Sequence, residues 1–293
     1  MALVTDQRAY LLLLAVILIW AGNFPLSKLG LGELPPTTIT AIRALIAAPV
    51  FLAVAVWRAP LGRPLDARDL SAFAVLGLTG LVGNTTVWYW GMVHTTPLNA
   101  GIIGATAPIF VSLASWVVLG DRLTPWNWVG IALSVLAVLV TVAKGSVDVL
   151  LALAVNRGDL IVLGSQALWV VYSIFTRLAP SGLPPAWVMA GSHVVSAIVL
   201  VPLSLAIDEP WVSPLAAPRG WMVILYGALP VTLGHLWYYG IVRTIGPARA
   251  ATFLNLMPFV VIAMTWAMLG EPVRGYHVAG AALVIAGVFL ASK

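Results

Sequence analysis

The hydrophobic pattern of the chain consists of ten long apolar stretches separated by short polar connectors. A helix needs about 20 apolar residues to cross the hydrocarbon core of a bilayer. With charges, Pro-Pro pairs and Gly/Asp turns taken as boundaries, the predicted spans are 9–28, 37–57, 70–92, 98–119, 125–143, 158–177, 186–207, 220–241, 250–269 and 275–291. Even the longest connectors leave no room for a soluble domain. The pattern therefore predicts an all-α integral membrane protein with ten transmembrane helices.

Composition supports the membrane prediction and excludes other classes. Of the 293 residues, 61% are hydrophobic and 9% are charged, whereas a soluble domain averages about 25% charged residues. So few charges exclude a soluble domain, and the apolar content excludes a disordered chain. The absence of cysteine removes disulfides, thiolate catalysis and zinc–cysteine sites. The net charge of +5 is spread over connectors without a long basic run, so we expect no nucleic-acid partner.

The distribution of basic residues predicts the orientation in the membrane. Cytoplasmic connectors of membrane proteins carry an excess of lysine and arginine. On the side of the N-terminus lie Arg8, Arg58, Arg63, Arg68, Arg122, Arg177, Arg243, Arg249 and Lys293, and on the other side lie Lys28, Lys144, Arg157, Arg219 and Arg274. We therefore expect both termini in the cytoplasm and the chain in a bacterial-type inner (plasma) membrane.

An internal repeat divides the chain into two halves. At an offset of 149 residues, Trp20 recurs as Trp169, and the Leu-Pro-Pro sequence at 34–36 recurs at 183–185. After one inserted residue the offset becomes 150, and Gly130 recurs as Gly280. The predicted units are 1–148 and 149–293, each with five helices. Because five is odd, the second unit enters the membrane with the opposite polarity, an architecture that recurs in secondary transporters.

The 5+5 inverted repeat, together with Trp20, Arg43 and the Gly-Asp or Gly-Glu pairs at 120–121 and 270–271, resembles the drug/metabolite transporter superfamily. The likeness is to its EamA-like ten-helix members and covers essentially the whole chain. Within that group the chain looks most similar to the YddG-type aromatic amino-acid exporters. The resemblance implies alternating access around a cavity lined by the first, third, fourth, sixth, eighth and ninth helices. It also implies export of small amphipathic metabolites, with aromatic amino acids as the expected substrate.

Polar and aromatic side chains within the spans are candidate substrate contacts, because polar groups inside a membrane are costly. Trp20 and Asn23 share one face of the first helix, and Gln166, Trp169 and Tyr172 share one face of the sixth. Such a face suits a ligand with an apolar body and polar ends, although hydrogen bonding between helices would use the same residues. The predicted cavity residues are Trp20, Asn23, Trp88, Tyr89, Thr106, Gln166, Trp169, Tyr172, Trp237, Tyr238 and Asn255. For the aromatic residues of the third and eighth helices, a place in the interfacial aromatic belt is the alternative.

Five further residues are given other roles. Pro108 and Pro258 are repeat mates that each remove a helical hydrogen bond, so we expect kinks that take part in gating. Arg43 is predicted to be a structural charge that packs the repeat, with a substrate carboxylate as its alternative partner. His193 and His235 are candidates for proton coupling, and a hydrogen-bonding strut is their alternative role.

The distribution of acidic residues limits the function classes. All ten aspartates and glutamates fall in connectors or at helix ends, which argues against a carboxylate proton relay. With no cysteine and no His-x-x-x-His motif either, we expect no enzyme, no metal and no cofactor. The remaining alternatives are transport of a nucleobase, drug or sugar phosphate, or a channel whose flux does not saturate. The expected partners are a small-molecule substrate and the lipid bilayer, with the chain acting as a monomer.

Overall fold

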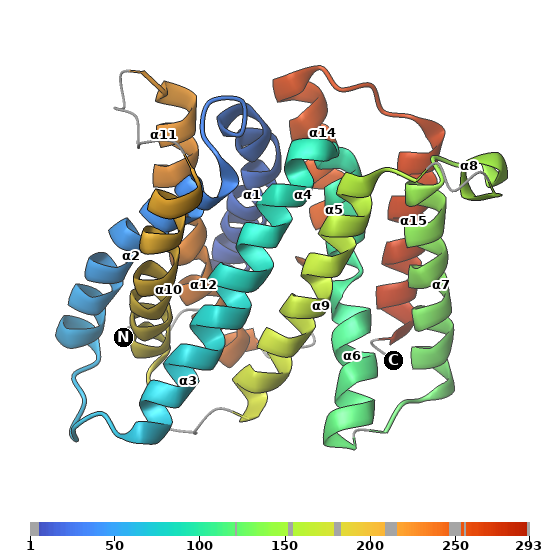
Figure 1. Cartoon of the computed structure of the whole chain (residues 1–293). Helices are drawn as coiled ribbons and strands as arrows, with labels where there is room; N and C mark the ends of the chain where they lie inside the picture. The colour runs from blue at the N-terminus through green and yellow to red at the C-terminus, as the bar shows by residue number, and fades with distance from the viewer. Residues whose placement is uncertain are drawn as a thin grey trace.

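The computed structural model describes residues 6–120, 122–151, 155–178, 183–208, 216–245, 253–254 and 256–291, which form helices and connectors without any strand (Figure 1). Eight helices in these ranges are long and apolar enough to cross a membrane. Two shorter apolar helices, Met257–Leu269 and Gly275–Ala291, follow them. The all-helical membrane architecture is thus confirmed. The predicted ninth span falls partly on residues 250–252 and 255, which lie outside the described ranges.

The helices follow one another with short connections. In chain order they are α1 (Asp6–Gly30), α2 (Pro36–Arg58), α3 (Ala67–Gly77), η1 (Leu78–Thr85), α4 (Thr86–His94), α5 (Pro97–Ala105), α6 (Ala107–Leu119), α7 (Pro125–Val142), α8 (Val147–Leu151), α9 (Arg157–Leu178), α10 (Pro185–Ile207), α11 (Pro218–Tyr226), η2 (Gly227–Val231), α12 (Thr232–Ile245), α14 (Met257–Leu269) and α15 (Gly275–Ala291). The predicted third and eighth spans correspond to α3–η1–α4 and α11–η2–α12. The predicted fourth span is divided into α5 and α6.

Local chemistry sets where several helices begin and end. Pro36, Pro125 and Pro185 are the first residues of α2, α7 and α10. At that position proline loses no intrahelical hydrogen bond, and its fixed φ suits a helix. Gly120 and Gly270 end α6 and α14 with φ of 73° and 64°, a left-handed conformation that glycine adopts without a steric penalty. These glycines belong to the Gly-Asp and Gly-Glu pairs of the repeat.

Repeat mates pack against each other in opposite directions. At one end of the α2–α10 pair, the Thr38 hydroxyl donates to Asp208 Oδ2 at 2.7 Å. At the other end, Trp187 Nε1 donates to the carbonyl oxygen of Ala59 at 2.8 Å. Helices α2 and α10 therefore run antiparallel along their full length. Helices α7 and α15 also lie side by side (Figure 1).

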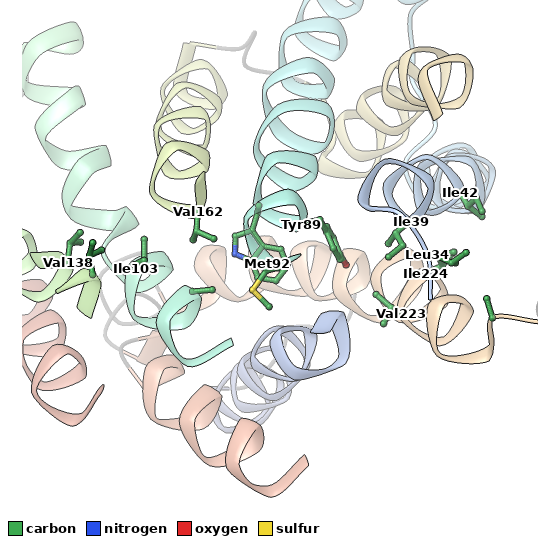
Figure 2. Packing of buried hydrophobic residues seen from close by; sticks show 14 residues of the cluster. Leu34, Ile39, Ile42, Tyr89, Met92, Ile103, Val138, Val162, Val223 and Ile224 are labelled. Carbon is green, nitrogen blue, oxygen red and sulfur yellow. The ribbon is translucent and has the colours of Figure 1, made fainter. Parts of the chain in front are cut away.

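A buried hydrophobic cluster joins α2, α4, α5, α7, α9 and α11 (Figure 2). Tyr89 and Met92 of α4 are completely buried within it. Val162 of α9 lies on one side of this pair and Ile39 of α2 on the other (Figure 2). The cluster lies beneath the end of the bundle that carries the α1–α2 and α14–α15 connectors, which we call the upper end (Figure 1).

Backbone contact between α7 and α15 predicts a strong effect of adding a side chain. A β carbon at Gly287 would lie 2.6 Å from Ser134 Oγ and 2.7 Å from the carbonyl oxygen of Gly130. Gly287→Leu is expected to lower the thermal unfolding temperature in detergent, because overpacking costs about 1–3 kcal/mol and a backbone carbonyl cannot move aside. Gly164→Leu is the matched control, since nothing lies within 4 Å of a β carbon there. Equal unfolding temperatures for the two variants would contradict the close approach.

Candidate functional site

A small cavity, with about 70 Å³ of free space, lies between the two halves of the chain. Its lining comes from α2, α3, η1, α9, α10 and α12, namely Arg43, Leu76, Gly80, Leu81, Asn84, Thr85, Trp169, Tyr172, Met189, Ser192, His193, Thr232 and His235. The third, sixth and eighth helices of the expected lining are present. Among the described residues, the second and seventh helices also contribute to the lining, whereas the first and fourth do not.

Two π-helical segments shape the cavity wall. Segment η1 interrupts the third helix and supplies four lining residues, and η2 interrupts the eighth helix just before Thr232. The hydroxyl of Thr86 donates to the carbonyl oxygen of Leu81 at 3.0 Å, and that of Thr232 to Gly227 at 3.1 Å. Within η2, Pro230 also lacks the N–H that a regular helix requires. Such wide turns occur frequently at functional sites.

An aromatic pair forms one wall of the cavity. The rings of Trp169 and Tyr172 on α9 are stacked, with centroids 5.2 Å apart and planes inclined by 24°. Opposite them, Gly80 of η1 approaches so closely that a β carbon there would lie 3.0 Å from the Tyr172 ring. The absence of a side chain at Gly80 lets the backbone of η1 pack against the Tyr172 ring. Flat aromatic surfaces of this kind stack favourably on another ring.

A single buried cation lies in the lining. Arg43 is 5% exposed, and the side chain of Tyr89 lies near its guanidinium. Its Nε has no hydrogen-bond partner among the residues that the structure describes. No acidic side chain belongs to the described lining of this cavity. The cavity thus carries a positive charge without a fixed counter-charge.

Both candidate histidines face the cavity with a defined tautomer. Nδ1 of His193 lies 2.7 Å from the carbonyl oxygen of Met189, and Nδ1 of His235 lies 2.8 Å from that of Val231. A carbonyl oxygen can only accept, so each Nδ1 carries the proton. In the neutral ring, Nε2 is then an acceptor. Each histidine therefore has one nitrogen bonded to its own helix and one nitrogen that can accept a hydrogen bond.

The remaining predicted cavity residues of the first and sixth helices lie behind the lining. Trp20 packs against His235 at 4.7 Å between ring centroids and donates from Nε1 to the carbonyl oxygen of Val231 at 3.2 Å. Asn23 is half-buried, and its Oδ1 has no partner among the described residues. Gln166 is buried and donates to a neighbouring serine hydroxyl. Of the three, Trp20 contacts a residue of the cavity lining.

The other predicted residues are dispersed. Tyr89 is completely buried and Trp88 is buried against it, while the hydroxyl of Thr106 donates to a carbonyl of its own helix. Trp237 and Tyr238 pack against α1. Asn255 lies outside the described residues. Sequence reasoning missed the lining residues of η1 and also Ser192, although Ser192 is the repeat mate of Arg43 at the 149-residue offset.

A polar network joins α1, α4, α5, α9 and α15 at the upper end of the bundle. Asp159, in the first turn of α9, is fully buried and accepts hydrogen bonds from the Thr95 hydroxyl and from Asn99 Nδ2, the latter at 3.0 and 3.2 Å. His277 Nε2 of α15 lies 3.2 Å from Asn99 Oδ1. Lys28 of α1 donates to the carbonyl oxygens of Met92 and Thr95 at 2.8 and 2.6 Å. We call Lys28, Thr95, Asn99, Asp159 and His277 the upper network.

Glu271 in the α14–α15 connector lies beside the upper network. Its carboxylate is hydrogen-bonded to the Thr96 side chain and the Leu98 backbone. Burial raises the pKa of Glu271 above its ordinary value, and these hydrogen bonds and nearby Lys28 partly offset that effect. The connector of the second half is thereby attached to the start of α5 in the first half.

Comparison with known proteins agrees with a transporter. Uncharacterized transporter YyaM of Bacillus subtilis is 28% identical over 97% of this chain and 93% of its own length. A probable terminal-alkyne amino-acid exporter of Streptantibioticus cattleyicolor is 29% identical over 98% and 94%, and a probable amino-acid metabolite efflux pump of Salmonella typhimurium is 26% identical over 95% and 93%. One crystal structure shares the fold, with a TM-score of 0.64 and 20% identity over 98% of both chains.

The family match covers both halves of the chain. The model of the EamA-like transporter family matches residues 7–143 and again residues 156–293. The family and the names of the relatives indicate a membrane transporter rather than an enzyme. Two consecutive matches also account for the repeat in the sequence. The chain belongs to the EamA-like transporter family.

Proposed function

We propose that the protein is a secondary transporter that exports small amphipathic metabolites, above all aromatic amino acids. The cavity carries this proposal, because it places the stacked Trp169–Tyr172 pair beside a buried cation and no acidic side chain among its described lining. An aromatic ring would stack on the pair while polar ends meet Arg43 and the histidines. The names of two relatives, which refer to amino-acid export, support the same substrate class.

The proposed mechanism is alternating access by two inverted five-helix halves, 1–148 and 149–293. The antiparallel packing of the repeat mates α2 and α10 supports it, since related halves of opposite polarity can form two mirror-related open states. In the conformation described here, the upper network would close one side. Opening would break it as the halves rock around the cavity.

The prolines of the fourth and ninth helices fit a role in this motion. Helix α5 ends at Ala105 and α6 begins at Ala107, so the fourth helix is interrupted two residues before Pro108. Pro258 follows directly after the first residue of α14. We propose hinges at both positions, in a monomer whose termini are cytoplasmic and whose upper end faces away from the cytoplasm of the inner membrane.

Transport by purified protein in proteoliposomes tests the function. Vesicles loaded with unlabelled phenylalanine should accumulate labelled phenylalanine, tyrosine or tryptophan faster than empty vesicles, and the initial rate should saturate with substrate concentration. Vesicles without protein give the background. Robust flux of another metabolite with none of the three amino acids would reject the substrate class. Flux that neither saturates nor responds to internal substrate would indicate a channel.

A further inference from the structure

We propose that Arg43 is the carboxylate-binding residue of the cavity, and that the cavity selects zwitterionic α-amino acids. In this arrangement the Nε2 lone pairs of His193 and His235 accept hydrogen bonds from the ammonium group. The proposal rests on the transport function above and deepens it. It replaces the structural role that the sequence favoured for Arg43 with a role in recognition.

Arg43 is a buried cation with no acidic side chain in the described lining around it. Burial of a charge costs several kcal/mol unless it is paired, and here the described lining offers no carboxylate. The two fully buried aspartates that the structure describes are occupied elsewhere. Asp69 pairs with Arg63 at 2.6 Å, and Asp159 belongs to the upper network. A substrate carboxylate would supply the missing counter-charge.

The guanidinium is confined by neighbouring groups. The side chain of Tyr89 lies near it, and the Tyr89 hydroxyl accepts a hydrogen bond from Ser27 Oγ at 3.3 Å. On another side, Gly227 of η2 lies so close that a β carbon there would be 2.9 Å from Cδ and 3.0 Å from Nε of Arg43. The π-helical segment thus leaves room for this side chain. Such preorganisation reduces the entropic cost of binding an anion.

The side chain does not reach the membrane surface. An arginine that snorkels places its charged group in the interfacial water, whereas Arg43 is buried within the bundle and lines the cavity. Its Nε lacks a partner among the described residues. The hydroxyl of Ser192, the repeat mate, lines the same cavity and also has no partner in the described part of the chain. Both groups are therefore available as donors to carboxylate oxygens.

The two histidines supply acceptors that suit the ammonium group of an amino acid. Their Nδ1 protons are engaged by backbone carbonyls of their own helices, so the acceptor Nε2 is the remaining ring nitrogen. An ammonium group donates three hydrogen bonds and accepts none. One cationic donor and two neutral acceptors around one cavity match the two ends of a zwitterion. A sugar phosphate would leave the histidine acceptors unused, and a cationic drug would leave Arg43 without an anion.

The test compares phenylalanine with two analogues that each lack one charged group. Phenethylamine lacks the carboxylate, and 3-phenylpropionate lacks the ammonium group. In wild-type proteoliposomes, phenylalanine should compete with labelled phenylalanine far better than either analogue. Arg43→Gln should raise the half-saturating concentration of phenylalanine by about 10- to 100-fold. It should also abolish the preference for phenylalanine over phenethylamine, which a purely structural role would leave unchanged.

Controls separate recognition from folding. Arg58→Gln removes a cation from the exposed end of the same helix and should leave selectivity unchanged. Arg43→Lys keeps the charge and should retain the preference for a carboxylate at reduced affinity. Equal competition by phenylalanine and phenethylamine in the wild type overturns the proposal without any variant. Wild-type protein that takes no aromatic amino acid overturns the transport function and, with it, this proposal.

Discussion

Replacing Asp159 by alanine is expected to slow transport and to open the cavity toward the upper end. Asp159 joins α9 to the junction of α4 and α5 through the Thr95 hydroxyl and Asn99 Nδ2. Without the carboxylate these buried donors lose their acceptor, at a cost of about 1–3 kcal/mol. The cost falls only on the conformation that is closed at the upper end. A coupling of this size corresponds to a shift of about 5- to 150-fold between the two conformations.

Cysteine labelling measures this shift directly. The chain contains no cysteine, so Thr85→Cys introduces a single thiol into the cavity lining. A membrane-impermeant maleimide applied from the upper side should react slowly in the otherwise wild-type chain and much faster after Asp159→Ala. Asp148→Ala, which removes an exposed acid from α8, is the matched control. Identical labelling rates with and without Asp159 would show that the upper network does not close the cavity.

Much of the architecture follows from the apolar pattern and the repeat. A span must satisfy its backbone internally, so long apolar stretches can only be helices here, and the prolines at 36, 125 and 185 mark where three of them begin. The π-helical segments were not predicted. They depend on tertiary packing, in which Gly80 meets the Tyr172 ring and Gly227 meets Arg43, rather than on a local propensity.

The candidate site was predictable only in part. Trp169 and Tyr172 were placed together on one face by helical spacing, and that face lines the cavity. Trp20 lies on an equally convincing face, yet it packs against His235, because spacing defines a face but not the neighbour that covers it. The role of Asp159 could not be inferred either. Its position at a helix end placed it only among the acids outside the membrane interior, whereas Gly158 lets α9 approach the end of α4 so closely that the carboxylate is buried.

Gly80→Leu is expected to block transport by filling the cavity. A β carbon at this position would already lie 3.0 Å from Cδ2 and Cε2 of Tyr172, so the rest of a leucine side chain must occupy the space in front of the Trp169–Tyr172 pair or displace it. Overpacking of this kind costs about 1–3 kcal/mol. If the cost arises only when substrate competes for the space, the affinity should fall by about 5- to 150-fold.

Comparing two substitutions at Gly80 with one on the outside of α9 distinguishes blockage from misfolding. Gly80→Ala should reduce the affinity for aromatic amino acids less than Gly80→Leu, because the ring of Tyr172 can yield by a few tenths of an ångström to a methyl group but not to an isobutyl group. Gly164→Leu adds the same side chain where nothing lies within 4 Å and should leave transport unchanged. Affinity for phenylalanine, measured together with elution as a single folded species, gives the readout. A folded Gly80→Leu protein with wild-type affinity would place the substrate away from the aromatic pair, since no ligand could stack there beside a leucine.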